Sequence, residues 1–394
     1  MNSPASTDET LAAWQEYLAS LTAEPGSAVD LVDRLLLLVS QSRASDVHID
    51  PTEGDLMLRW RLDGVLAPLG TVPRVMATSV VGRLKVLAGL LTYETALPQE
   101  GRLVSEATGG EFRVSTFPTL FGERAVLRSL GTSNSGLETL EQLGVGQSVL
   151  NTMRDALAAT TGAVVIVGPA GSGKTTTAYA AVREVVEQSG GGRAIHSLED
   201  PVEVVVPGVA QSQVSHSSGF TMAEALKSLV RQDPEVLMLG EIRDRATAAT
   251  TLEAALTGSL VITTFHAGST HEAVDRLVDM GIPPDAVQHA VRLVVAQRLV
   301  RKLCDCALEG EPTHDAAPLG FDVARCMGPA GCASCAGTGY RGRVLMAEVS
   351  TNITPHQTNT QIPFADAARE LIDSGVTSPG ELVRALGWRP AAGD

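Results

Sequence analysis

A glycine-rich loop between an apolar run and a helical pattern constrains this chain more than any other stretch. Residues 168–175 read G-P-A-G-S-G-K-T, after the apolar residues 163–167 and before small apolar residues at helical spacing. This pattern is typical of a P-loop, whose backbone N–H groups hold phosphate oxygens at a helix N-terminus. Lys174 is predicted to reach the β- and γ-phosphates, and Thr175 to offer a hydroxyl to Mg²⁺. The predicted nucleotide-binding residues are Gly168, Pro169, Ala170, Gly171, Ser172, Gly173, Lys174, Thr175 and Thr176.

Composition restricts the class of protein. The chain has 394 residues, 44% of them hydrophobic, which suffices for two or three globular domains. No apolar run approaches the roughly 20 residues of a membrane span, and the N-terminus lacks the pattern of a signal peptide. We therefore predict a cytoplasmic location and no transmembrane segment. The net charge of −15 disfavours direct binding of nucleic acid.

The first third of the chain has the pattern of a small α+β domain. Leu11, Trp14, Leu18 and Leu21 recur at helical spacing, in a helix that packs either on its own chain or on a partner. A second helix is predicted over residues 29–41. Strands follow from residue 44 onward, where apolar and polar residues alternate, and Asp63-Gly64 is typical of a two-residue hairpin turn. Further elements are predicted as a helix at 80–91 and strands at 112–117 and 125–130. Arg113 and Arg128 fall on these last strands, either as site residues or as surface arginines.

The remainder has the pattern of a three-layer α/β domain. A Ser/Gly/Asn-rich stretch predicts a linker at 132–140. Apolar strands are then predicted at 163–167, 194–198, 236–239 and 260–265, separated by helical segments, as in a parallel sheet covered on both faces.

Polar residues follow three of these strands, at the sheet edge where ligands of such folds bind. Glu241 comes after 236–239 and is predicted to order Mg²⁺ or the attacking water. Glu199 and Glu203 belong to an acidic cluster after 194–198, and Glu203 is also predicted to bind the nucleotide. His266 follows 260–265 and is predicted to contact the γ-phosphate or the water.

Together these segments resemble the secretion ATPases of the type II secretion and type IV pilus assembly kind. The resemblance covers about residues 43–349, and its matching segments are 44–51, 61–65, 97–102, the P-loop, 198–203, 231–244 and 257–267. It implies a RecA-like P-loop ATPase core, preceded by a smaller α+β (PAS-like) domain and carrying a zinc-binding insertion and short C-terminal helices. The predicted parts are a tail with an amphipathic helix (1–27), the α+β domain (28–131), the linker (132–140) and the ATPase domain (141–394), which includes the cysteine segment (303–343) and C-terminal helices (361–390).

The resemblance also implies function. It implies a homohexamer that hydrolyses ATP with Mg²⁺ and acts with an inner-membrane platform protein, peripherally at the cytoplasmic membrane, to assemble a pilus or pseudopilus. By the same resemblance, Glu241, Lys174, Glu199 and His266 form the catalytic set, and Arg113 and Arg128 reach the phosphates. Ser259 stands where many relatives have a histidine.

All five cysteines lie between residues 304 and 335, which favours a metal site over disulfides. Cys332 and Cys335 resemble the second half of the family's four-cysteine zinc motif. Only one residue separates Cys304 from Cys306, so Cys326 or His314 is kept as a substitute ligand. A structural zinc on Cys304, Cys306, Cys332 and Cys335 is the prediction, and unliganded thiols are the alternative.

Two other functions stay open from the sequence. One is an assembly scaffold that binds ATP with negligible turnover, and the other is a related ATPase of a conjugation or DNA-uptake system. The intact Lys174, Thr175 and Glu241 disfavour the scaffold, since these residues serve hydrolysis.

Overall fold

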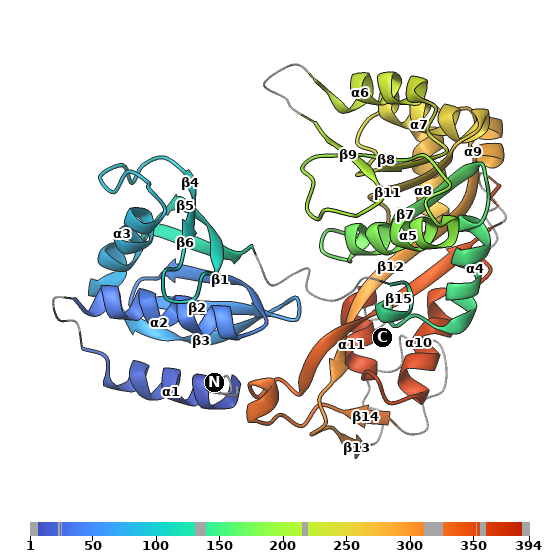
Figure 1. Ribbon diagram of the computed structural model, residues 1–394. Helices are drawn as coiled ribbons and strands as arrows, with labels where there is room; N and C mark the ends of the chain where they lie inside the picture. The colour runs from blue at the N-terminus through green and yellow to red at the C-terminus, as the bar shows by residue number, and fades with distance from the viewer. Residues whose placement is uncertain are drawn as a thin grey trace. The chain divides into compact units, whose positions relative to one another are not determined.

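The chain folds into two compact units (Figure 1). The computed structural model describes residues 7–22, 24, 26–130, 139–214, 220–310, 326–351, 353–354 and 360–387. The first unit comprises Met1–Ser135, Cys304–Cys306 and Ala330–Arg341, and the second comprises the other residues. The division after Ser135 falls inside the predicted linker, of which residues 132–138 lie outside the described part.

The first unit is an antiparallel sheet with helices on one face, which confirms the α+β class. The sheet order is β3-β2-β1-β6-β5-β4. Its elements are α1 (Thr7–Ser20), α2 (Ser27–Gln41), β1 (Ala44–Pro51), β2 (Asp55–Leu62), β3 (Val65–Pro73), η1 (Arg74–Met76), α3 (Ala77–Leu87), β4 (Gln99–Val104), β5 (Glu111–Thr119) and β6 (Gly122–Ser129).

Alternation along the strands produces one core face. Val47, Ile49 and Trp60 are buried in the same cluster as Leu31 and Leu35 of α2. The predicted hairpin joins β2 to β3, with Leu62 paired to Val65 and positive φ at Asp63 and Gly64. The core face therefore follows from the two-residue period of the sequence.

Helix α1 packs on its own chain, the first of the two alternatives. Trp14 is 3% exposed, and its Nε1 donates a hydrogen bond to the Leu69 carbonyl at 3.2 Å. Leu18 lies so close to Gly70 that a Cβ there would be 2.3 Å from its Cδ1, and Gly70 has a φ of +149°. Glycine is favoured at position 70 because this φ is one that L side chains rarely adopt.

The second unit is the predicted three-layer α/β domain. Its sheet order is β15-β12-β7-β11-β10-β8-β9, and the pairs from β12 to β9 are parallel. Its elements to β11 are η2 (Glu141–Leu143), α4 (Gln147–Leu157), β7 (Gly162–Val167), α5 (Lys174–Ser189), β8 (Ile195–Glu199), β9 (Ala210–Gln213), α6 (Met222–Leu229), η4 (Val230–Gln232), β10 (Val236–Leu239), α7 (Arg245–Thr257) and β11 (Leu260–Phe265). The rest are α8 (Thr270–Asp279), α9 (Pro284–Ala290), β12 (Val291–Leu303), β13 (Leu308–Gly310), β14 (Cys326–Gly328), β15 (Tyr340–Ser350), α10 (Phe364–Asp373) and α11 (Pro379–Leu386).

Each central strand buries side chains on both faces of this sheet. Val165 and Val167 of β7 belong to a core with α6 to α11, whereas Val164 and Ile166 belong to a core with α4 and α5. A strand buried on both faces is apolar throughout, which is why the run was visible in the sequence.

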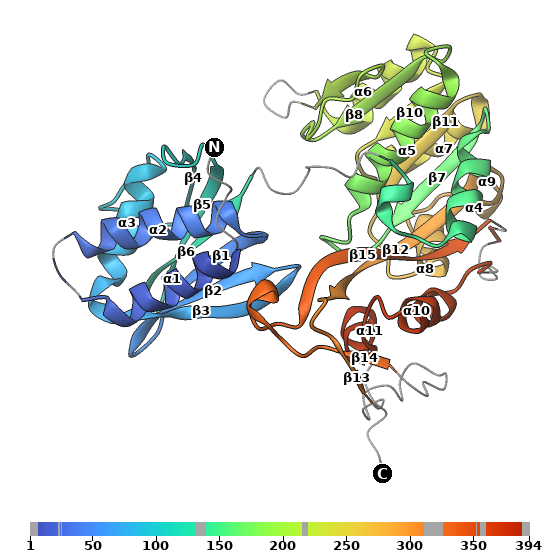
Figure 2. The same cartoon turned by 60° about the horizontal axis from the view of Figure 1, so that its bottom comes forward.

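The cysteine segment groups differently from the prediction. We expected residues 303–343 within the second domain, but Cys304–Cys306 and Ala330–Arg341 group with the first unit. β12 and β15 are neighbours in the sheet of the second unit and lead into this segment (Figure 2). A short helical turn, η6 (Ala333–Cys335), lies within it.

Two helices occupy the C-terminal region, where residues 361–390 were predicted to carry them. Glu381 of α11 has a side chain with 0% exposure and forms ion pairs with Arg301 of β12 at 2.8 Å and with Arg384 at 2.5 Å. It also accepts a hydrogen bond from the Arg301 N–H at 2.9 Å. Burial raises the pKa of Glu381, but the hydrogen bonds from Arg384 and Arg301 outweigh burial, and the net pKa is lowered.

Replacing Glu381 by glutamine should destabilise the second unit by about 2–3 kcal/mol at pH 7, because two arginines lose charge-assisted hydrogen bonds to a buried carboxylate. A carboxylate with a lowered folded pKa stabilises fully above its ordinary pKa, and this contribution is lost as pH falls through the folded pKa. The difference in the free energy of unfolding between wild type and Glu381→Gln, measured with urea, should therefore become smaller at acidic pH. An advantage independent of pH would contradict the ion-pair explanation.

Candidate nucleotide-binding site

The phosphate loop joins the buried strand β7 to helix α5. Gly168, Gly171 and Gly173 have φ values of +157°, +74° and +87°. A Cβ on Gly168 would lie 2.4 Å from Ser172 Oγ and 2.6 Å from the Gln297 carbonyl oxygen. The loop thus requires glycine for both conformation and space. The N-terminus of the 16-residue α5, at Lys174, supplies backbone N–H groups and the positive end of a helix dipole.

Lys174 lies across the loop. Its Nζ donates hydrogen bonds to the Gly168 and Pro169 carbonyls, both at 3.0 Å. Burial lowers the pKa of Lys174 by more than the charge of Glu241 raises it, so the net pKa is lowered. Thr175 is exposed in the first turn of α5, where its hydroxyl is accessible to a metal ion.

The structure brings Glu241 and His266 together, although 25 positions separate them in the sequence. His266 Nε2 lies 3.4 Å from Glu241 Oε2, and Glu241 also pairs with Arg243. Thr264 of β11 holds the turn that carries Glu241: its hydroxyl donates to the Gly240 carbonyl at 2.6 Å, and its carbonyl accepts from the Ile242 N–H at 2.9 Å. The carboxyl ends of β10 and β11 therefore place a carboxylate and an imidazole side by side.

Glu199 is turned into the protein. It is 3% exposed at the end of β8, and its Oε1 accepts from the Ser197 hydroxyl at 2.5 Å and from Gln211 Nε2 at 3.0 Å. Its Oε2 accepts from the Tyr179 hydroxyl. With both oxygens engaged, Glu199 fits a positioning role better than contact with water.

Tyr179 of α5 is a site residue that sequence reasoning missed. Besides donating to Glu199, its hydroxyl accepts from the Glu203 N–H at 3.2 Å. Burial, followed by the hydrogen bond to Glu199, raises the pKa of Tyr179. The helix after the phosphate loop is thereby tied to the acidic cluster. A hydroxyl on the apolar stripe of α5 was the available signal.

Ser259 lies at the other edge of the sheet. It precedes β11, whereas His266 follows it, and its buried hydroxyl donates to the Pro234 carbonyl at 2.7 Å. In this chain Ser259 connects two segments structurally.

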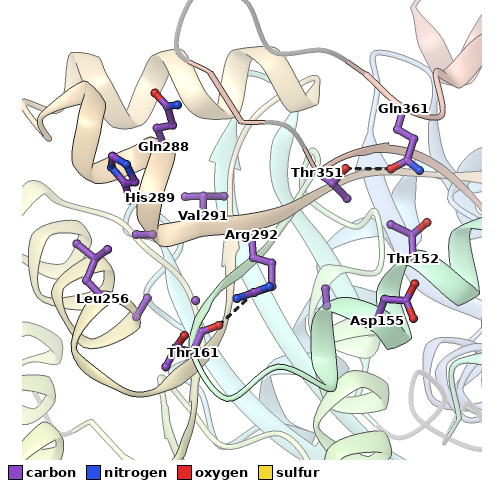
Figure 3. A pocket seen from close by; sticks show the side chains of 14 residues that line it. Thr152, Asp155, Thr161, Leu256, Gln288, His289, Val291, Arg292, Thr351 and Gln361 are labelled. Carbon is purple, nitrogen blue, oxygen red and sulfur yellow. Dashed lines mark hydrogen bonds between the residues drawn. The ribbon is translucent and has the colours of Figure 1, made fainter.

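A polar hollow of about 590 Å³ also lies at that other edge (Figure 3). Gly162, the first residue of β7, lines it together with Asp155, His289 and Arg292. Arg292 Nε donates to the Thr161 carbonyl at 3.1 Å, and the three charged or ionisable side chains are exposed. The phosphate loop follows the opposite end of β7, so this hollow is separate from it.

Arg113 and Arg128 lie side by side in the first unit. They are register partners on β5 and β6, so both project from the face opposite the core. Arg128 Nε lies 2.7 Å from Asp46 Oδ1, and Arg113 Nε lies 3.2 Å from Glu100 Oε1. Their side chains remain 62% and 43% exposed. Burial raises the pKa of Asp46, but hydrogen bonds from Arg128 and Ser45 outweigh it, so its pKa is lowered.

The cysteine cluster contains the four predicted ligands. The sulfur atoms of Cys304, Cys306, Cys332 and Cys335 all lie within 4.8 Å of one another. Three of the pairs are separated by 3.8–3.9 Å. Four thiolates about 2.3 Å from a tetrahedral zinc would lie roughly 3.8 Å apart, so the arrangement fits this ion.

The four sulfur atoms converge although only one residue separates Cys304 from Cys306. Cys326 lies elsewhere, with its sulfur 3.9 Å from the Gly310 carbonyl oxygen, and His314 falls outside the described residues. Burial raises the pKa of Cys335, but N–H groups of Cys332 and Gly339 outweigh it and lower the pKa to about 7. These groups support a thiolate.

The cysteine segment packs on the first unit through η6. Ala336 contacts the core of that unit, and a small hollow separates residues 334–341 from Ser42, Arg43, Trp60 and Asp63. The cluster thus belongs to the same compact body as the arginine pair.

A parallel sheet with a glycine-rich loop at a helix N-terminus, faced by strand-end acidic and imidazole groups, defines a P-loop nucleotide-binding protein. The chain belongs to the family described as Type II/IV secretion system protein, whose model matches residues 22–370. The family resemblance is therefore confirmed.

Curated relatives carry names of two kinds. The chain is 38% identical over 367 residues to the type IV pilus assembly ATPase PilB of Myxococcus xanthus, covering 90% of this chain and 62% of that protein. It is 36% identical to the PilB of Thermus thermophilus, covering 85% and 38%. It is 35% identical to the type II secretion system protein E of Klebsiella pneumoniae, covering 90% and 75%. The chain thus spans less than two thirds of the two PilB relatives.

Solved structures confirm the RecA-like fold. The ATPase DotB of Legionella pneumophila superposes with a TM-score of 0.60 at 20% identity, covering 93% of each chain. The pilus retraction motor PilT, solved with bound ADP, superposes with a TM-score of 0.55 at 21% identity, covering 91% of this chain and 97% of that one. Among the described residues, none of the helices combines the length and hydropathy needed to cross a bilayer.

Proposed function

We propose that this chain hydrolyses ATP and uses the energy to assemble a type IV pilus or a type II secretion pseudopilus. The observation that carries the proposal is the pairing of Glu241 with His266 in the domain that holds Lys174 on its phosphate loop. The names of the relatives support the cellular role. The sequence alone left hydrolysis and passive nucleotide binding open, and the paired strand-end groups favour hydrolysis.

The residues present fit ATP and Mg²⁺. At Gly171, whose φ is +74°, no other heavy atom lies within 4 Å of a Cβ position, so the main chain there is open to phosphate oxygens. The Thr175 hydroxyl and the Glu241 carboxylate are oxygen donors of the kind that Mg²⁺ prefers. Mg²⁺, when bound, neutralises charge on the phosphates.

Glu241 orients the attacking water, and His266 restricts the position of the Glu241 carboxylate. Lys174 exchanges its two loop carbonyls for phosphate oxygens when nucleotide binds. Glu199 and Tyr179 keep the acidic cluster fixed to α5. The contacts that position Glu241 and Glu199 are already present in the protein, so these carboxylates need little reorganisation during reaction.

Arg113 and Arg128 act on the phosphates of the bound nucleotide. A planar, permanently charged guanidinium stabilises charge on the transferring phosphoryl group. Asp46 and Glu100 hold the pair ready on one sheet face.

The four cysteines hold a structural zinc ion. The chain works as a homohexamer on an inner-membrane platform protein, at the cytoplasmic face of that membrane. Membership of the secretion family and the relatives' names support these assignments. The oligomer is testable by light scattering of the ADP-bound protein, where a single-chain mass would contradict it.

The purified chain should release phosphate from ATP only when Mg²⁺ is present. Arg113→Ala and Arg128→Ala should each lower kcat by roughly 1,000-fold or more, since an arginine that stabilises the transition-state charge is worth about 10³–10⁵ in phosphoryl transfer. The exposed Arg34→Ala on α2, paired with Asp30 on the other side of the sheet, serves as control. Absence of phosphate release from a protein that binds ATP would identify a scaffold instead.

A further inference from the structure

Gln297 of β12 lies beside the phosphate loop without belonging to any motif recognised in the sequence. The pairing of Ala296 with Val167 places the next residue of each strand, Gln297 and Gly168, at the same level. Gln297 has 0% exposure. A glutamine is seldom fully buried unless its amide forms hydrogen bonds.

The Gln297 side chain makes one hydrogen bond, and it goes to the loop. Its Nε2 donates to the Ser172 carbonyl oxygen at 2.6 Å. Its Oε1 is buried without a hydrogen-bond partner among the described residues. In the reverse amide orientation, Gln297 Oε1 would lie against the Ser172 carbonyl oxygen, and two acceptors cannot form a hydrogen bond. The Nε2 donor therefore points at Ser172. Burying an unpaired amide oxygen is unfavourable, and an apolar residue would avoid it.

Peptide geometry shows what this hydrogen bond controls. The Ser172 carbonyl and the Gly173 N–H belong to one planar trans peptide, in which the two groups point in opposite directions. Gly173 has positive φ, a conformation that glycine leaves easily. Holding the carbonyl toward β12 therefore directs the Gly173 N–H away from β12, into the loop.

We propose that Gln297 is a positioning residue that fixes the Ser172-Gly173 peptide so that its N–H faces the nucleotide phosphates. The Gln297 amide donates to the carbonyl from within the sheet and does not contact the nucleotide itself. This assignment rests on the proposed function, because it presupposes phosphate binding in the loop. It adds a residue more than 120 positions away from the glycine-rich motif to the anion-binding site.

The test is ADP binding to the full-length chain, measured by calorimetry with Mg²⁺. Gln297→Met keeps size but removes the donor, and should weaken ADP binding about 10-fold. Gln297→Glu places a second acceptor against the Ser172 carbonyl and should weaken it about 100-fold. Gln188→Met, at an exposed position near the far end of α5, is the matched control and should bind like wild type.

Urea unfolding without nucleotide separates positioning from general stability. The proposal predicts that Gln297→Met unfolds at nearly the wild-type urea concentration despite its weaker binding. Equal ADP affinity in Gln297→Met and wild type overturns the assignment while leaving the proposed function intact. An affinity loss matched by a proportional loss of stability also overturns it. Failure of the wild-type chain to bind ADP overturns both.

Discussion

Replacing Glu241 by glutamine should lower the rate of ATP hydrolysis at least about 100-fold while changing ADP affinity little. The amide is nearly isosteric, so the contacts of the turn with Thr264 should persist. What is lost is a carboxylate able to orient or deprotonate water, and general base contributions of this kind amount to about 10²–10⁴-fold. Steady-state phosphate release and calorimetric ADP binding measure the two quantities.

The control for this substitution is Glu253→Gln on α7. Glu253 is exposed, so the same chemical change should leave turnover unaffected. If Glu241→Gln retained wild-type turnover, another group would have to activate the water, and His266 would be the next residue to replace. A parallel fall in ADP affinity would instead indicate damage to the loop.

Removing zinc should destabilise the first unit, because the cysteine segment packs on that unit. Cys332→Ser should lower the zinc content from one per chain toward zero and the melting temperature of this unit by roughly 5–15 °C. Zinc binding to structural sites contributes on the order of 10 kcal/mol to folding. We expect only part of this free energy to be lost in the variant, which sets the size of the fall in melting temperature. Metal analysis and differential scanning calorimetry provide the measurements.

Cys326→Ser is the matched control for the zinc prediction. Its thiol lies outside the cluster, so zinc content and melting should not change. A purified protein that is free of metal and melts like the zinc-loaded form would refute the structural role. Equal losses in both serine variants would point to a general sensitivity of this segment.

Much of the site was predictable because parallel strands end at the same edge. Glu241 and His266 each follow an apolar strand, and a sheet brings such positions together whatever their separation in the chain. The phosphate loop was predictable for a local reason, since its glycines satisfy backbone needs within eight residues.

Other residues carried too little local signal. β12 was not predicted, because its apolar residues follow neither a strict two-residue nor a helical period over all 13 positions. Gln297 was missed with it. Tyr179 was overlooked because a hydroxyl on an apolar helix face shows its role only when Glu199 is placed opposite.

The sequence by itself determined the phosphate loop, the α/β class of the second unit and the chemistry available at its strand ends. These depend on short-range backbone requirements and on the period of apolar residues, both of which are written locally in the chain. The tertiary structure alone decided that Glu199 faces inward, that Gln297 holds the loop and that the four cysteines converge and pack with the first unit. Such relations depend on side-chain packing between different segments of the chain, from 12 residues apart for Glu199 and Gln211 to 125 for Gln297 and Ser172, which no local pattern specifies.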